Sequence, residues 1–222
     1  MVVDSNLTLY SYWRSSCSWR VRIALNLKKI PYSYHSVNLL KGEHLRPEFL
    51  SVNPRSFLPV LSLGGGANLA DSMAIIEYIE EKYPDSGIPL LPKSPEARAV
   101  VRSLAYYVSS GIQPLQNMNV MKRVGAGDSA KAAAHNKHFI TIGFDALEKE
   151  LERSAGKYAV GDELSLVDVV IPAQVYNAIR FGVDMSKYPT ISRLNATLEK
   201  IPEFIAADAW HQPDTPENER RS

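Results

Sequence analysis

Up to Tyr83, the pattern of apolar and polar residues predicts strands and helices that alternate along the chain. Residues 7–12 alternate between apolar and polar side chains, which predicts a half-buried strand, and residues 17–29 have the amphipathic period of a helix. The pattern then predicts a strand over residues 32–37, a short helix near residues 47–50, a strand over residues 57–63 and a last strand that ends near Ala70. Asp71 and Ser72 are helix-capping residues, and the helix after them is stopped by Pro84. The predicted order is βαβ followed by ββα.

The rest of the chain has a different pattern. Prolines and glycines crowd the segment after residue 84, where no period is visible, so we interpret residues 85–95 as a linker. Beyond it every long segment has a helical period. We therefore expect an α/β domain over residues 1–84 and an all-helical domain over residues 96–222. The prolines Pro114 and Pro172 are predicted to lie inside helices, and the polar tail from His211 onward is predicted to be frayed.

Composition limits the classes of function. The 222 residues carry 25 Lys and Arg against 24 Asp and Glu, a formal net charge of +1, so nothing electrostatic favours nucleic acid or an anionic membrane as a partner. The single cysteine, Cys17, fits a reducing compartment, and no apolar run approaches the roughly 20 residues that span a bilayer. The first residues lack the pattern of a signal peptide, so we expect a cytoplasmic protein. The five histidines form no ligand motif, and no metal is expected.

A polar turn with a thiol, Ser15-Ser16-Cys17-Ser18, lies between the first predicted strand and the first predicted helix. A helix N-terminus carries unpaired N–H groups and about half a positive charge, so it favours a thiolate or carboxylate there by about 0.3–1 kcal/mol. Serine is also a preferred N-cap residue. The residues alone therefore leave open whether the turn binds an anion or only caps the helix.

Longer motifs resemble one class of proteins. Residues 15–22, which read Ser-Ser-Cys-Ser-Trp-Arg-Val-Arg, are similar to the signature of the zeta class of the soluble glutathione transferases. The resemblance continues over nearly the whole chain, at Asn53-Pro54, Leu58-Pro59 and residues 71–78, 111–117 and 212–216. It implies a thioredoxin-like first domain, a helical second domain and glutathione as the cofactor. Asp71 departs from the class, in which a glutamine or glutamate usually precedes the serine.

The resemblance also implies which residues bind glutathione. Ser15, Ser16 and Cys17 would surround its sulfur, and we choose Ser15 as the donor that lowers the thiol pKa. Leu58-Pro59 would be a cis peptide beside the cysteinyl part, and Asp71 and Ser72 would hold the γ-glutamyl group. The remaining candidates are Ser18, Trp19, Arg20, His44, Gln113 and Asn117. A solvated loop is the alternative for His44, and hydrogen bonds between helices are the alternative for Gln113 and Asn117.

The implied reaction is the glutathione-dependent cis-trans isomerisation of maleylacetoacetate to fumarylacetoacetate, a step in phenylalanine and tyrosine degradation. The same site would conjugate glutathione to small halogenated acids. Arg180 matches a family arginine that faces the cleft and would bind a carboxylate of this dicarboxylate substrate. Arg20 and Arg22 are further candidates for that role, with a solvated or interdomain ion pair as the alternative. A homodimer is implied as well.

Two other functions stay open. Cys17 lies near the position where thioredoxin-like proteins keep a redox cysteine, so a monothiol glutathione-dependent reductase is one alternative. A glutathione-binding or ligand-carrying module without turnover is the other, because a fold does not determine a function. Arg180 and the intact Ser15-Ser16-Cys17 turn favour an enzyme.

Overall fold

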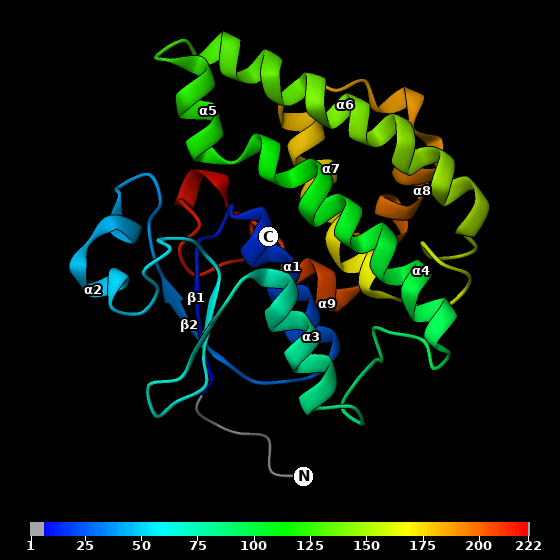
Figure 1. The fold of residues 1–222 in the computed structure, drawn as a ribbon, viewed down its shortest axis with the longest axis horizontal. Helices are drawn as coiled ribbons and strands as arrows, with labels where there is room; N and C mark the ends of the chain where they lie inside the picture. The colour runs from blue at the N-terminus through cyan, green and yellow to red at the C-terminus, as the bar shows by residue number, and fades with distance from the viewer. Residues whose placement is uncertain (1–6, 222) are drawn as a thin grey trace. The chain divides into compact units, whose positions relative to one another are not determined.

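The computed structural model describes residues 7–221, and the chain divides into two compact units (Figure 1). Unit 1 consists of Met1–Pro89 and Ile201–Ser222, and unit 2 consists of Leu90–Lys200. The helical unit therefore ends at Lys200, and not at residue 222 as predicted. The last segment, from Ile201 onward, belongs to the α/β unit, because its contacts are with elements from the start of the chain.

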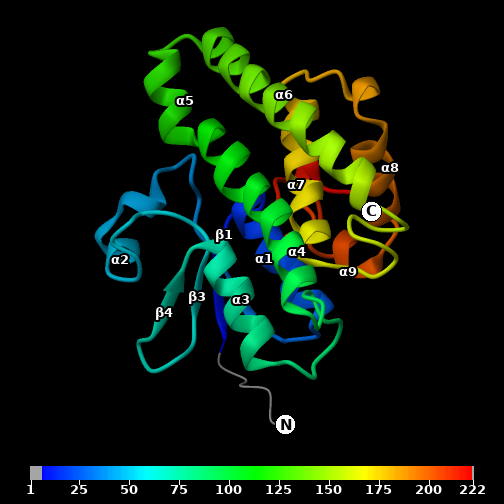
Figure 2. The ribbon, with the colours of Figure 1, turned by 45° about the vertical axis from the view of Figure 1, so that its right-hand side comes forward.

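The sheet of unit 1 has four strands in the order β2-β1-β3-β4. β1 (Thr8–Ser11) pairs in parallel with β2 (Ser33–Ser36), whereas β3 (Val60–Ser62) runs antiparallel to both β1 and β4 (Asn68–Ala70). The predicted order of βαβ followed by ββα is confirmed. α1 (Ser16–Leu27) and α3 (Ser72–Lys82) lie on one face of the sheet, and the short α2 (Pro47–Leu50) lies on the other side (Figure 2).

The strand register brings several chain segments to one end of the sheet. Tyr10 of β1 pairs with Val60, the first residue of β3, and Val60 pairs with Ala70, the last residue of β4. Ser11 at the end of β1 pairs in parallel with Ser36 at the end of β2. The loop before α1, the peptide before β3, the start of α3 and the loop after β2 consequently all leave the sheet at the same end.

α1 is the central helix of unit 1. It packs against α3 and against α9 (Pro202–Ile205), and all but two of its residues are buried. The buried residues include two arginines as well as an apolar set. Lys28, which follows the helix, is also buried, and its Nζ lies 3.1 Å from Oε2 of Glu80 in α3. Because a charge inside a protein needs a partner, these cations determine which segments must meet around α1.

Unit 2 is built from helices. None of the described helices combines the length and the apolar character needed to cross a bilayer. Pro172 lies inside a helix as predicted, but Pro114 does not: it is near the start of a 3-10 turn, where its missing N–H is no loss. The helices are α4 (Pro95–Tyr106), α5 (Met118–Gly125), α6 (Ser129–Ser154), α7 (Leu166–Arg180) and α8 (Pro189–Leu198), with a π-helical turn (Tyr107–Ile112) and a 3-10 turn (Gln113–Gln116) between α4 and α5.

The carboxyl-terminal tail, up to residue 221, is held in place by hydrogen bonds rather than frayed, which corrects the prediction; residue 222 lies outside the described residues. Nε2 of Gln212 donates hydrogen bonds to the carbonyls of Ala206 and Asp208, and the hydroxyl of Thr215 donates to the carbonyl of Ala209. Gln212 and Thr215 are buried. The polar composition suggested a solvated segment, but these polar side chains form hydrogen bonds with the backbone of the tail.

Asp168 stabilises the start of α7, and its removal should destabilise the protein. Its buried carboxylate accepts hydrogen bonds from the N–H of Ala159 at 2.9 Å and from the N–H and hydroxyl of Ser165 at 2.8 and 2.9 Å. Asp168→Ala leaves these donors without a partner and should lower the free energy of unfolding by about 2–4 kcal/mol in chemical denaturation. Asp184→Ala is the matched control, because it removes an exposed cap, and should have a much smaller effect. Equal losses in the two variants would contradict this role.

The pH dependence of stability gives a second test of Asp168. Burial raises the pKa of Asp168 to about 6, above the value of about 4 in an unfolded chain. The folded protein therefore holds this proton more tightly, so the contribution of Asp168 to stability falls as the pH rises from about 4 to about 6. The difference in unfolding free energy between the wild-type protein and Asp168→Ala should decrease across that window. A constant difference would be the contrary result.

Candidate active site

The turn Ser15–Ser18 begins α1 and presents several polar groups. Ser15 is the N-cap residue: its backbone N–H donates to the carbonyl of Tyr12 at 2.9 Å, and its Oγ accepts the N–H of Ser18 at 3.2 Å. Because Oγ accepts that bond through a lone pair, the hydroxyl can still donate its hydrogen to an anion. Cys17 carries a free, half-buried thiol. Ser18 is fully buried, and no described residue forms a hydrogen bond with its Oγ.

The start of α3 presents a second group of polar atoms. Oδ1 of Asp71 accepts the N–H groups of Met73 at 2.8 Å and Ala74 at 3.2 Å, so Asp71 caps this helix as predicted. Its φ of 84° lies in a region that non-glycine residues rarely adopt, and such outliers concentrate at functional sites. The buried Ser72 accepts a hydrogen bond at its Oγ from Nη1 of Arg20 at 3.3 Å. Arg20 thereby links α1 to the first residue of α3.

The arginines of α1 that the sequence offers as substrate contacts have structural partners. Arg20 is 2% exposed and donates to Ser72. Arg22 is completely buried, and its guanidinium donates to Oγ of Ser11 and to the carbonyls of Tyr12, Trp13 and Ala207. Burial lowers the pKa of Arg22 from its ordinary value. With these oxygens as its partners, Arg22 is a structural residue, which corrects its reading as a substrate cation or solvated ion pair.

Other predicted site residues of unit 1 lie near the same end of the sheet. The Leu58-Pro59 peptide is cis, as the resemblance implies, and it directly precedes β3. His44 is half-buried in a 3-10 turn on the loop that leaves β2 at this end. Trp19 is buried in α1, where its ring meets Trp210 edge to face at 5.7 Å. Unit 1 therefore brings together the thiol turn, the cis peptide and the start of α3.

Three predicted site residues belong to unit 2. Gln113 is half-buried at the start of the 3-10 turn, and Asn117 caps α5 by accepting the N–H of Asn119 at 3.2 Å. Arg180 is exposed in the last turn of α7, with its guanidinium 5.0 Å from the centre of the Phe181 ring.

A buried amide pair in unit 2 was missed by the sequence prediction. Nε2 of Gln116 donates to Oε1 of Gln174 at 2.7 Å. The pair joins the turn that carries Gln113 and Asn117 to α7, which carries Arg180. Gln116 lies within the motif of residues 111–117, but the motif alone does not tell which of its glutamines points into the helical core.

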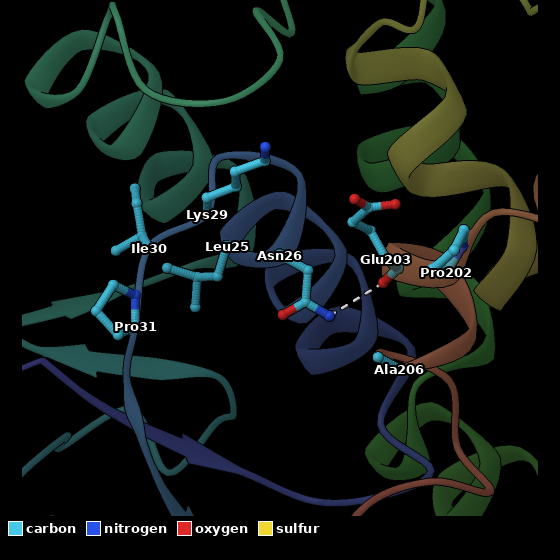
Figure 3. Close-up of a pocket in the computed structure, with 8 residues that line it drawn as sticks. All are labelled: Leu25, Asn26, Lys29, Ile30, Pro31, Pro202, Glu203 and Ala206. Carbon is cyan, nitrogen blue, oxygen red and sulfur yellow. Dashed lines mark hydrogen bonds between the residues drawn. The ribbon is translucent and has the colours of Figure 1, made fainter.

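A cavity of about 460 Å³ lies at the opposite end of α1 from the thiol turn (Figure 3). It is bounded by the last residues of α1 and by α9, where Nδ2 of Asn26 donates to the carbonyl of Glu203 at 3.0 Å. None of the predicted site residues lines this cavity. Its lining consists of Leu25, Asn26, Lys29, Ile30, Pro31, Pro202, Glu203 and Ala206.

The donor groups of unit 1 fit glutathione. Helix N-termini attract anions, and α1 and α3 both begin at the same end of the sheet. The hydroxyl of Ser15 and the N–H groups of α1 suit a thiolate, while Ser72 at the start of α3 suits a carboxylate, and glutathione contains both groups. Within residues 7–221, no three His, Cys, Asp or Glu side chains gather as a metal site.

Comparisons with known proteins agree with this geometry. The family models "Glutathione S-transferase, N-terminal domain" and "Glutathione S-transferase, C-terminal domain" match residues 14–82 and 118–207. Maleylacetoacetate isomerase of Dictyostelium discoideum is 46% identical over 217 residues, which is 96% of this chain and 98% of the relative. A zeta-class glutathione S-transferase of Euphorbia esula is 47% identical over 212 residues, or 94% of this chain and 92% of the relative.

A solved structure extends the similarity to the fold. Maleylacetoacetate isomerase from Anaeromyxobacter dehalogenans, with glutathione bound in its active site, superimposes with a TM-score of 0.85 and 40% sequence identity. The match covers 95% of this chain and 98% of that one.

Proposed function

We propose that this chain, which belongs to the zeta class of the glutathione S-transferase family, catalyses the glutathione-dependent cis-trans isomerisation of maleylacetoacetate to fumarylacetoacetate. The observation that carries the proposal is the turn Ser15–Ser18 at the N-terminus of α1, at the end of the sheet where α3 also begins. The relatives named maleylacetoacetate isomerase support the choice of substrate.

Ser15 has the main role in the proposed mechanism. When bound, glutathione supplies a thiolate that adds to the cis double bond, turns it into a rotatable single bond and leaves unchanged after rotation. The hydroxyl of Ser15 and the N–H groups at the start of α1 stabilise the anionic sulfur, which lowers the thiol pKa from about 8.5. Ser16 and Cys17 belong to the same turn, where Cys17 adjusts binding.

Residues of each unit also have proposed roles. Asp71 and Ser72 hold the γ-glutamyl amine and carboxylate, with Arg20 fixing the hydroxyl of Ser72. Arg180 binds a carboxylate of the substrate and steadies the enolate that forms during the reaction. The other proposed cofactor contacts are Ser18, Trp19, His44, Leu58, Pro59, Gln113 and Asn117.

The family resemblance supports three further proposals. The protein acts as a homodimer, it works in the cytoplasm on phenylalanine and tyrosine breakdown products, and the same site conjugates glutathione to small halogenated acids. The single cysteine, Cys17, fits a reducing compartment.

The wild-type protein should isomerise maleylacetoacetate only in the presence of glutathione and without consuming it. A coupled assay for the fumaryl product, combined with titration of free thiol, measures both quantities. Loss of glutathione as disulfide without fumaryl product would instead indicate the reductase that works through Cys17. Binding of glutathione without turnover would indicate a carrier.

Ser15→Ala should reduce turnover far more than Cys17→Ala. Removal of one preorganised donor to a developing or bound anion lowers turnover by about 10²–10³-fold, and the pKa of the bound thiol should rise because the anion loses a hydrogen bond. Titration of thiolate absorbance in the two variants measures this pKa. Near-normal activity in Ser15→Ala together with an inactive Cys17→Ala would contradict the assignment.

Arg180→Ala should raise the KM for the dicarboxylate about 10- to 100-fold, because a charge-assisted pair is worth roughly 1.5–3 kcal/mol. The affinity for glutathione measured by calorimetry should hardly change, since residues of unit 1 provide most of its contacts. Arg153→Ala is the matched control, because Arg153 is an exposed arginine of the same unit, with Nη1 3.5 Å from Glu150. An equal loss of affinity for glutathione and for the acid would remove the substrate role of Arg180.

A further inference from the structure

The motif of residues 212–216 has no part in the mechanism above, yet its aspartate contacts the loop that leads to the thiol turn. In Figure 1 the red carboxyl-terminal segment lies beside the blue loop that precedes α1, where Asp214 contacts Trp13. We propose that Asp214 is a positioning residue, which fixes the loop before Ser15 and so places the Ser15 hydroxyl against the sulfur of glutathione. This inference rests on the proposed function.

Asp214 bridges two elements of unit 1. Its Oδ2 accepts the backbone N–H of Trp13 at 3.0 Å, and its Oδ1 accepts the hydroxyl of Tyr34 at 2.6 Å. Trp13 lies only two residues before Ser15, and Tyr34 lies in β2, the strand next to β1. Burial raises the pKa of Tyr34 well above its ordinary value, so its hydroxyl keeps the proton that it donates. One carboxylate therefore ties the loop to the sheet.

The same loop is held on its other side by Arg22. Its guanidinium donates to the carbonyl of Trp13 at 3.0 Å and to the carbonyl of Tyr12 at 3.4 Å, and it also donates to the carbonyl of Ala207 at 2.8 Å. The N–H of Trp13 thus bonds to Asp214, while its carbonyl bonds to Arg22. Because the loop follows the last paired residue of β1, these side chains rather than the strand ladder set its path.

Asp214 itself sits in a rigid segment. Pro213 and Pro216 fix φ on both sides of Asp214. The hydroxyl of Thr215 accepts the N–H of Gln212 at 3.2 Å and donates to the carbonyl of Ala209 at 2.7 Å. Because the backbone at Asp214 is constrained, its carboxylate has a fixed position. The carboxylate therefore determines where the loop lies.

Placement of Ser15 is what this arrangement controls. A displacement of about 1 Å at a reacting group costs about 10²-fold in rate, even when its cause lies outside the reacting groups. Without Asp214 the protein should still fold and bind the keto acid, but the Ser15 hydroxyl should stabilise the thiolate less well. The loss of Asp214 should therefore change kcat and the thiol pKa, but not the KM for the keto acid.

Asp214→Ala should lower kcat about 10- to 100-fold, raise the pKa of bound glutathione and leave the KM for maleylacetoacetate nearly unchanged. Asp214→Asn should recover most of kcat, because its amide oxygen can accept from Trp13 while its amide NH₂ donates to the Tyr34 hydroxyl. Glu217→Ala is the matched control: Glu217 is an acidic residue of the same segment, and its side chain is exposed in the 3-10 turn Glu217–Glu219. It should behave as the wild-type protein.

Hydrogen exchange at the amides of residues 13–18, measured without glutathione, tests the positioning independently of activity. Faster exchange in Asp214→Ala but not in Glu217→Ala would support the inference, whatever the outcome of the isomerase assay. Unchanged exchange and an unchanged thiol pKa in Asp214→Ala would overturn it, even if the wild-type enzyme is active. If Asp214→Ala does not fold, Tyr34→Phe is the substitute, because it removes only one of the two hydrogen bonds of Asp214. It should give a smaller loss of kcat and a smaller increase in the rate of amide exchange. Wild-type values for both quantities would overturn the inference.

Discussion

The buried guanidinium of Arg22 is the interaction on which the rest of unit 1 depends. A charge without water must have its donors satisfied, and Arg22 meets this need with oxygens from the end of β1, the loop after it and the carboxyl-terminal segment. The carboxyl-terminal segment is far from the other two in sequence, yet all three must meet at the Arg22 guanidinium. The cost of leaving such a charge unpaired fixes the path of the chain on both sides of the thiol turn.

The candidate site is placed by strand register and helix capping together. Pairing of Tyr10, Val60 and Ala70 puts the starts of α1 and α3 at one end of the sheet, and each helix is capped there by a short polar side chain. Ser15 and Asp71 therefore accept N–H groups of their own helices and lie next to the groups that we propose bind glutathione. Asp71 stands where the class usually has a glutamine or glutamate, and its carboxylate accepts N–H groups of its own helix.

The two units hold different parts of the proposed chemistry. Unit 1 contains the thiol turn, the cis peptide and the start of α3, which suit the constant cofactor. Unit 2 carries Arg180 on α7, and the buried bond between Gln116 and Gln174 ties this helix to the turn with Gln113 and Asn117. Because a buried amide pair is costly to break, it holds α7 and this turn, which carry proposed substrate and cofactor contacts, in a defined relation to one another.

Local pattern by itself determined the strands and helices of unit 1, the caps at Ser15 and Asp71 and the helical character of unit 2, because periodicity and capping act over a few residues. Family resemblance added the cis peptide and the choice of site residues. Only the tertiary structure decided that Arg22 is structural, that Pro114 lies in a 3-10 turn, that Gln116 is the buried glutamine and that the tail returns to the sheet. Asp214 shows the reason: its partners, Trp13 and Tyr34, lie at the other end of the chain, and no local pattern reports a contact at that separation.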